Sequence, residues 1–322
     1  MVRASIYGAV LIAVGTAVAS AQTTARDQGS PTFRASTNMV LLDVSVRDGK
    51  RRNVPNLRKD SFQIYDDDVE QEIASFSYEQ RPVSWGLVLD RSGSMMGMMD
   101  EVYNAALHSV EAGTPEDETF ILAFDDRLDM VSPFTTDRAS LVTAIKEISP
   151  GGSTALYDAV LRGLQELKRG RHQKKVLIVV TDGEDNASRT RFEDLLERAK
   201  QSEAQIYTIG MFSEMSLDLL DSFEGGVKRQ LEAMSEITGG LAYFPKNVRQ
   251  CDRACKDIAD QVSRQYTIGY YPKRAEWNGQ WRTIQVKTPR SSTYSVRARK
   301  GYYAVGDAEH DIARQSAASK PR

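Results

Sequence analysis

One stretch of this sequence carries residue types and a spacing that suit a divalent cation. Asp90, Ser92 and Ser94 stand at alternate positions directly after the apolar run Trp85–Leu89. One carboxylate and two neutral hydroxyl oxygens are hard donors, and hard donors suit a cation such as Mg²⁺. Three such oxygens form an incomplete coordination shell, so the remaining ligands must come from elsewhere in the chain.

Two later segments offer further ligands. Thr154 follows a Gly-Gly-Ser turn and precedes the predicted helix Ala155–Leu167, which places a hydroxyl beside a helix N-terminus. Asp182 ends a second apolar run, as Asp90 ends the first. In open α/β sheets, ligands bind at the carboxyl ends of the strands, where the strand order reverses. If these two acidic strands are neighbours at that point, both carboxylates meet in one crevice and Thr154 reaches it from the connecting loop.

The region that must position these residues alternates apolar strands with helical patterns from residue 85 to about 245. Regular alternation of this kind predicts an α/β fold with a doubly wound, mostly parallel sheet and helices on both faces. Leu128–Phe134 follows the preceding strand too closely for a crossover, so we predict one antiparallel edge strand there. The other predicted strands are Trp85–Leu89, Thr119–Phe124, Lys175–Val180, Gln205–Gly210 and Leu241–Phe244, and the predicted helices are Met99–Val110, Arg138–Ile148, Ala155–Leu167, Arg191–Lys200 and Lys228–Ile237.

Segments rich in β pattern flank this region on both sides. Ser61–Tyr65 and Gln71–Phe76 alternate apolar and polar residues before it, and Trp281–Lys287 does so after it. A few strands alone bury too little apolar surface to be stable. We therefore expect the N- and C-terminal strands to pool into one domain like a β-sandwich, with the α/β domain inserted between them.

The first residues resemble a secretory signal. Arg3 precedes the apolar stretch Ile6–Val18, and Ala19-Ser20-Ala21 then forms a small-residue cleavage pattern. The apolar stretch is short for a membrane-spanning helix, although an uncleaved anchor is the alternative. We expect an exported protein, periplasmic or extracellular, with no stable membrane span after cleavage.

The predicted organisation has six segments. They are a signal peptide at 1–21, a disordered stretch at 22–34, an N-terminal β-rich segment at 35–80, the α/β domain at 81–250, a helix with C-terminal β strands that pack with the N-terminal segment at 251–304, and a disordered tail at 305–322.

Charge and cysteine content narrow the function classes. The formal net charge of −2 lacks the basic excess of nucleic-acid binders, so we expect no nucleic-acid partner. Cys251 and Cys255 are the two cysteines of the chain. In an exported protein, a pair this close predicts a local disulfide at the start of a helix, with free thiols or a strained, reducible bridge as alternatives.

Taken together, Asp90-x-Ser92-x-Ser94, Thr154 and Thr-Asp182-Gly resemble the von Willebrand factor type A domain and its metal-ion-dependent adhesion site, over roughly residues 80 to 250. The resemblance implies that the three hydroxyls coordinate the cation and that the two carboxylates bind it directly or through water. The whole layout is similar to bacterial exported proteins described only as von Willebrand factor A-related.

One departure from the family pattern is the extra residue Ser153, which leaves either Ser153 or Thr154 to point into the site. Thr154 is preferred because Ala-Leu-Tyr-Asp-Ala follows it as the pattern requires. Next to the first motif, Met95 and Met96 begin a methionine-rich stretch that fits either core packing or an adaptable apolar rim.

The expected function is metal-mediated adhesion. Mg²⁺, with Mn²⁺ or Ca²⁺ as alternatives, would keep an open coordination position that a carboxylate of a protein partner completes. A structural module of the cell envelope, whose metal only rigidifies the site, is the second hypothesis. An enzyme is the third: a Mg²⁺-dependent phosphatase of the haloacid dehalogenase type needs Asp-x-Asp, but position 92 is Ser, and no Gly-x-Ser-x-Gly elbow occurs. We therefore expect no enzymatic activity.

Overall fold

The computed structural model describes residues 39–212, 224–274, 276–288 and 293–305. The predicted signal peptide, the predicted disordered stretch after it and all but the first residue of the predicted tail lie outside the described residues. Within the described ranges, none of the helices combines the length and the apolar character needed to cross a bilayer.

A six-stranded sheet forms the centre of the α/β domain, in the order β10-β9-β8-β5-β6-β7. Neighbouring strands are parallel except for β6 and β7, which pair antiparallel at one edge. The order reverses between β5 and β8, which are hydrogen-bonded neighbours. The predicted doubly wound sheet with one antiparallel edge strand is confirmed. Its strands are β5 (Val83–Asp90), β6 (Glu118–Phe124), β7 (Leu128–Thr135), β8 (Lys174–Thr181), β9 (Gln205–Gly210) and β10 (Ala242–Tyr243).

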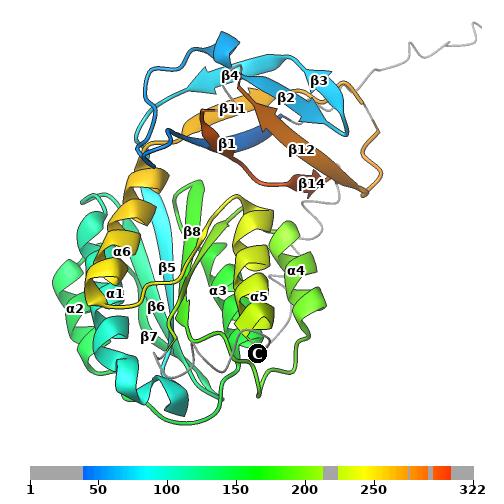
Figure 1. The fold of residues 1–322 in the computed structure, drawn as a ribbon. Coiled ribbons are helices and arrows are strands. Elements are labelled where there is room, and N and C mark those ends of the chain that lie inside the picture. Colours follow the sequence, from blue (N-terminus) through cyan, green and yellow to red (C-terminus); the bar gives the residue numbers. More distant parts are fainter. Residues whose placement is uncertain (1–38, 213–223, 275, 289–292, 306–322) are drawn as a thin grey trace, which may run out of the picture. The chain divides into compact units, whose positions relative to one another are not determined.

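Helices cover both faces of this sheet (Figure 1). Leu87 and Leu89 of β5 pack with α1, α2 and α6, whereas Val88 points to the opposite face and packs with α3, α4 and α5. Because both faces of β5 are buried, its sequence is an uninterrupted apolar run rather than an alternating one. The helices are α1 (Met99–Ala112), α2 (Arg138–Lys146), α3 (Leu156–Leu167), α4 (Phe192–Lys200), α5 (Glu224–Thr238) and α6 (Val248–Ser263), with a 3₁₀ helix η2 (Gly93–Met98) before α1.

Strands from the two flanking segments form two small antiparallel sheets, as predicted. One has the order β13-β1-β11-β4 and the other β14-β12-β2-β3, so each contains N-terminal and C-terminal strands. Leu42 and Ile268 of the first sheet share one buried apolar core with Ile64 and Ile284 of the second. The elements are β1 (Val40–Arg47), η1 (Lys59–Ser61), β2 (Gln63–Asp66), β3 (Val69–Gln71), β4 (Ile73–Ser77), β11 (Tyr266–Tyr270), β12 (Trp281–Lys287), β13 (Ser295–Arg297) and β14 (Gly301–Tyr303).

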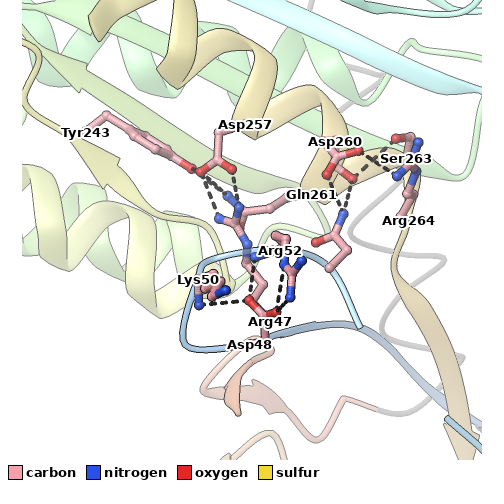
Figure 2. Close-up of polar contacts among 11 residues, drawn as sticks. Arg47, Asp48, Lys50, Arg52, Tyr243, Asp257, Asp260, Gln261, Ser263 and Arg264 are labelled. Atoms are coloured by element: carbon pink, nitrogen blue, oxygen red, sulfur yellow. Dashed lines mark hydrogen bonds and ion pairs between the residues drawn. The ribbon is translucent and has the colours of Figure 1, made fainter. Parts of the chain in front are cut away.

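A polar contact joins β1 to α6. Figure 2 shows the Arg47 guanidinium against the Asp257 carboxylate, with an Nη1–Oδ2 distance of 2.8 Å. The hydroxyl of Tyr243 donates to the same carboxylate at 2.6 Å. The Gln261 amide donates to the Tyr243 hydroxyl and to the Asp257 carboxylate. The side chain of Arg47 is only 10% exposed, so its charge is neutralised within the protein rather than by water.

The predicted disulfide is not formed: Cys251 and Cys255 are free cysteines. We expected them at a helix start, but α6 begins at Val248, where the side chain of Asn247 caps it by accepting from the N–H of Gln250. The two cysteines therefore lie one turn apart inside the helix and are buried against α1. This apolar face places α6 in the core of the α/β domain, whereas the sequence analysis groups it with the C-terminal strands.

Candidate functional site

Asp90 is the last residue of β5 and is fully buried at the carboxyl end of the sheet. Its Oδ1 accepts from the N–H of Ser92 at 2.9 Å, and its Oδ2 accepts from the hydroxyl of Thr181 at 2.6 Å. Thr181 is the last residue of the neighbouring strand β8 and directly precedes Asp182. The two acidic strand ends are thus neighbours at the point where the strand order reverses, which is the condition stated above for the two carboxylates to meet in one crevice.

The hydroxyls of the first loop lie together. Ser92 Oγ and Ser94 Oγ are 3.2 Å apart, with Ser92 buried and Ser94 exposed. The 3₁₀ helix η2 starts immediately after Ser92, so its tight turn brings the two alternate serines to the same side. Met95 is fully buried, whereas Met96 is 63% exposed. Core packing and an exposed rim therefore both occur in the methionine stretch.

The second loop is tied to the first through backbone hydrogen bonds. The N–H of Gly93 donates to the carbonyl of Gly152 at 3.0 Å, and the N–H of Gly151 donates to the carbonyl of Arg91 at 2.8 Å. Gly152 has a φ of +79°, and a Cβ there would lie 2.4 Å from Asp126 Oδ1, so the close approach of the second loop to the β6–β7 hairpin requires glycine. Of the two residues that follow Gly152, Ser153 is exposed and Thr154 is buried.

The third loop, which follows β8, is tied to the second through Asn186. Its Oδ1 accepts from the N–H of Thr154 at 2.8 Å, and its own N–H donates back to the carbonyl of Thr154 at 3.0 Å. Asp182 is half-buried and accepts from the N–H of Glu184 at 3.2 Å. The structure thus brings the three predicted segments into one hydrogen-bonded cluster.

The two ionisable side chains among the five candidate ligands, Asp90 and Asp182, are both acidic. Burial raises the pKa of Asp90 to about 6, although hydrogen bonds from Ser92 and Thr181 act in the opposite direction, and the nearby charge of Asp182 adds to the increase. In the part of the chain that the structure describes, no ion pair involves Asp90 or Asp182. A buried carboxylate that lacks a positive partner is costly in its charged form.

Two carboxylates and three hydroxyls fit a hard divalent cation better than zinc. Zinc favours Cys, His and carboxylate ligands, and no group of three or more His, Cys, Asp or Glu residues suited to a metal occurs among the described residues. Oxygen donors of mixed charge suit Mg²⁺, Mn²⁺ or Ca²⁺. Asp90, Ser92, Ser94, Thr154 and Asp182 are the side chains that would hold such an ion.

Three residues beyond the five predicted ligands shape this cluster, and two of them, Thr181 and Arg91, stand within the motifs without a predicted role. Thr181 links the two acidic strands, Asn186 links the second and third loops, and Arg91 links the first loop to Asp125 at the end of β6. Burial alone would raise the pKa of Asp125, but hydrogen bonds from Arg127 and the charge of Arg91 outweigh it and lower the pKa. Position 91 is unspecified in the Asp-x-Ser-x-Ser motif, so its role becomes visible only through its partner 34 residues away.

Comparison with known proteins places this cluster in a matched domain. Residues 86–184, which include the five candidate ligands from Asp90 to Asp182, match the von Willebrand factor type A domain. An uncharacterized protein of Synechocystis sp. is 26% identical over 168 residues, covering 51% of this chain and 40% of that protein. Inter-alpha-trypsin inhibitor heavy chain H3 of Mesocricetus auratus is 26% identical over 182 residues, covering 50% of this chain and 20% of that protein. The chain therefore spans less than half the length of these two relatives.

Solved structures with a similar backbone come from several bacteria. A von Willebrand factor type A protein from Catenulispora acidiphila has a TM-score of 0.48 and 11% identity, covering 80% of this chain and 76% of that one. The von Willebrand factor domain of the pili tip protein Mfa5 from Porphyromonas gingivalis has a TM-score of 0.47 and 14% identity, covering 57% of this chain and 95% of that one.

Proposed function

We propose that this chain is an exported protein that binds a protein partner through a divalent cation, with Mg²⁺ the best fit. Asp90, Ser92, Ser94, Thr154 and Asp182 would hold the ion, and a carboxylate of the partner would complete its coordination. The observation that carries the proposal is the hydrogen-bonded convergence of three loops at the carboxyl ends of β5 and β8. The match of residues 86–184 to a domain type that generally binds proteins supports it.

The donor set explains why a partner carboxylate is the expected ligand. Mg²⁺ prefers six oxygens in near-octahedral geometry, and the five side chains leave at least one position for another molecule. Three of the five donors are neutral hydroxyls, so the protein neutralises the ion only in part. Ser94 and Asp182 are the more exposed members, which makes the side of the cluster near them the approach for a partner.

A role in rigidity alone is less well supported. The three loops are already joined by backbone and side-chain hydrogen bonds between protein groups, such as Gly93 to Gly152 and Thr154 to Asn186. An ion is therefore not needed to hold them together. We also propose that the protein is not an enzyme, because Ser92 occupies the place where a phosphatase of the considered type needs a second carboxylate.

The proposal is tested in two steps with the full chain after removal of metal by a chelator. Binding of Mn²⁺ is first measured by electron paramagnetic resonance, since Mn²⁺ accepts the same ligands as Mg²⁺. The protein is then immobilised and exposed to cell-envelope extract with Mg²⁺ or with EDTA. We expect one Mn²⁺ per chain and capture of a protein only with Mg²⁺.

Matched variants separate the site from its surroundings. Asp182→Ala and Thr154→Ala should abolish Mn²⁺ binding and capture while the protein stays folded. Ser153→Ala is the control, because it removes an exposed hydroxyl next to Thr154 without removing a proposed ligand. Absence of Mn²⁺ binding by the wild type, or equal binding by Asp182→Ala, would contradict the proposal. Cation binding that raises the melting temperature without any captured partner would favour the rigidity hypothesis instead.

A further inference from the structure

Arg91 belongs to the first loop by its backbone and to the β6–β7 hairpin by its side chain. It stands between Asp90 and Ser92, and its guanidinium Nε donates to Asp125 Oδ2 at 3.1 Å while Nη2 pairs with Asp129. The side chain of Arg91 is only 13% exposed although it carries a full charge. This residue therefore has a fixed position, set by two carboxylates on a neighbouring element.

The backbone of Arg91 is held in the same way. Its N–H donates to the carbonyl of Phe124 at 2.9 Å, and its carbonyl accepts from the N–H of Gly151 at 2.8 Å. One residue thus contacts the end of β6, the following hairpin and the loop that carries Thr154. Rotation of the first loop would break all of these contacts together.

Asp125 is the counterpart of Arg91 on the hairpin. Its side chain is 1% exposed and its backbone carbonyl accepts from the N–H of Ala155 at 2.9 Å, directly beside Thr154. Cβ and Cγ of Asp125 also lie 2.9 and 3.1 Å from where a Cβ of Gly152 would be. Asp125 therefore contacts the serine-bearing loop through Arg91 and the threonine-bearing loop through its own backbone.

From this arrangement we infer that Arg91 and Asp125 are positioning residues that set the spacing between Ser92 and Thr154, and that this spacing makes the site select Mg²⁺ over Ca²⁺. The inference rests on the proposed function. Mg²⁺ demands near-octahedral oxygens at about 2.0–2.1 Å, whereas Ca²⁺ accepts six to eight oxygens at about 2.3–2.6 Å in flexible geometry. Loosening the two loops therefore weakens Mg²⁺ binding more than Ca²⁺ binding.

Arg127 provides a matched control. Its Nη2 lies 3.1 Å from the same Asp125 oxygen that accepts from Arg91, but its side chain is 70% exposed and its backbone lies outside the cation loops. If the ion pair mattered only because it neutralises Asp125, the loss of either arginine would have the same effect. If Arg91 positions the loop, only its loss changes the preference between the cations.

The test measures Mg²⁺ and Ca²⁺ affinities by titration calorimetry for the wild type, Arg91→Met, Arg91→Lys and Arg127→Met. We expect Arg91→Met to weaken Mg²⁺ binding by about tenfold or more, the size typical of residues that orient metal ligands, and Ca²⁺ binding by less than about threefold. Arg91→Lys should recover part of the loss, since one amine can reach only one of the two carboxylates. Arg127→Met should leave the ratio of the two affinities unchanged.

A second measurement is independent of any cation. In the metal-free protein, the Gly151 amide, which donates to the carbonyl of Arg91, should exchange its hydrogen faster in Arg91→Met than in Arg127→Met. Unchanged exchange, an unchanged affinity ratio in folded Arg91→Met, or the same shift in Arg127→Met would overturn the positioning role and leave the proposed function intact. A wild type that binds neither cation would overturn both.

Discussion

Charged side chains at the amino ends of the parallel strands have different kinds of partner from those at the carboxyl ends. At the amino end, the Lys174 ammonium at the start of β8 donates to the carbonyl of Val262 near the end of α6, and Arg47 pairs with Asp257 of the same helix. At the carboxyl end, Asp90 meets hydroxyl and backbone donors and a second acid, Asp182. At the amino end, Arg47 is paired with a carboxylate of the protein and the Lys174 ammonium meets a backbone carbonyl, whereas among the described residues no cation of the protein pairs with Asp90 or Asp182.

This difference supports the proposal that the carboxyl end is the binding end, while charges at the amino end affect stability. Buried charges in proteins are normally paired or bind metals, so an acidic pair that has no positive partner among the described residues fits the proposed cation site. The Arg47–Asp257 ion pair of the other end instead connects β1 to α6 of the α/β domain. The predictions below alter one end at a time.

The largest expected effect on stability comes from breaking the Arg47–Asp257 ion pair at the amino end. Arg47→Met leaves the Asp257 carboxylate, with its side chain 23% exposed, without its cationic partner. Breaking a buried ion pair by removing one partner costs about 3–5 kcal/mol, and we expect the lower part of that range because Tyr243 and Gln261 still donate to Asp257. The free energy of unfolding from urea titration, with coincident probes for both domains, measures it.

Arg52→Ala is the matched control for that change. Arg52 pairs with Asp48 just beyond the same strand, but its side chain is 71% exposed, so its loss should change the unfolding free energy by less than about 1 kcal/mol. Equal effects of Arg47→Met and Arg52→Ala would show that the amino end gains no special stability from its buried charges.

A pH effect of similar origin is expected from Lys174. Burial lowers its pKa to about 8 from the ordinary 10.5, with Asp43, Arg81 and Asp117 as the charged groups around it. Between those pH values the unfolded chain binds a proton that the folded chain does not, so this lysine makes stability rise with pH across that window. Below pH 8 lysine is charged in both states, and its burial costs about 3 kcal/mol at 1.36 kcal/mol per pH unit.

The comparison of the wild type with Lys174→Met isolates this effect from other titrating groups. From pH 7 to pH 9.5 the wild type should gain about 2 kcal/mol of unfolding free energy relative to the variant, by the same conversion. If the unfolding free energies of the two proteins changed with pH in the same way, the Lys174 ammonium would be solvated and its burial would carry no cost.

Sequence reasoning identified the polar strand ends but not the contacts among the loops. The apolar runs that end in Asp90 and Asp182 predicted two buried strands, because both faces of such strands must be covered, while their adjacency entered only as a condition. In contrast, the bonds from Asn186 to Thr154 and from Arg91 to Asp125 join residues 32 and 34 positions apart, and a single sequence has no local pattern for them. These contacts depend on how loops meet in space.

The start of α6 was readable in the sequence and was missed. Asn247 followed by Gln250 is a helix N-terminus signal, and both side chains form capping bonds in the structure. With the helix starting there, Cys251 and Cys255 fall inside it and face α1, where a local bridge at a helix start has no place. The structure has free thiols at Cys251 and Cys255, which is one of the alternatives kept open beside the predicted disulfide.

The smallest expected effect on stability concerns Asp90, whose pH dependence is opposite in sign to that of Lys174. Burial raises the pKa of Asp90 from 3.8 to about 6, so the contribution of this group to stability falls as pH rises through that window and is fully lost at pH 7. In EDTA at pH 7, Asp90→Asn should therefore raise the unfolding free energy by about 1 kcal/mol. The gain is less than the shift alone implies, because the amide cannot accept from both Ser92 and Thr181.

Addition of Mg²⁺ should make the wild type more stable than Asp90→Asn. A cation at 100 times its dissociation constant stabilises the wild type by about 2.7 kcal/mol and does not stabilise Asp90→Asn, so the two unfolding curves exchange places. Asp257→Asn provides the contrast, since it removes a charge that already has a partner and should destabilise the protein equally with and without Mg²⁺. If Asp90→Asn were the less stable protein in EDTA as well, the acidic end would be neutralised by the protein itself, and the distinction between the two ends of the sheet would fail.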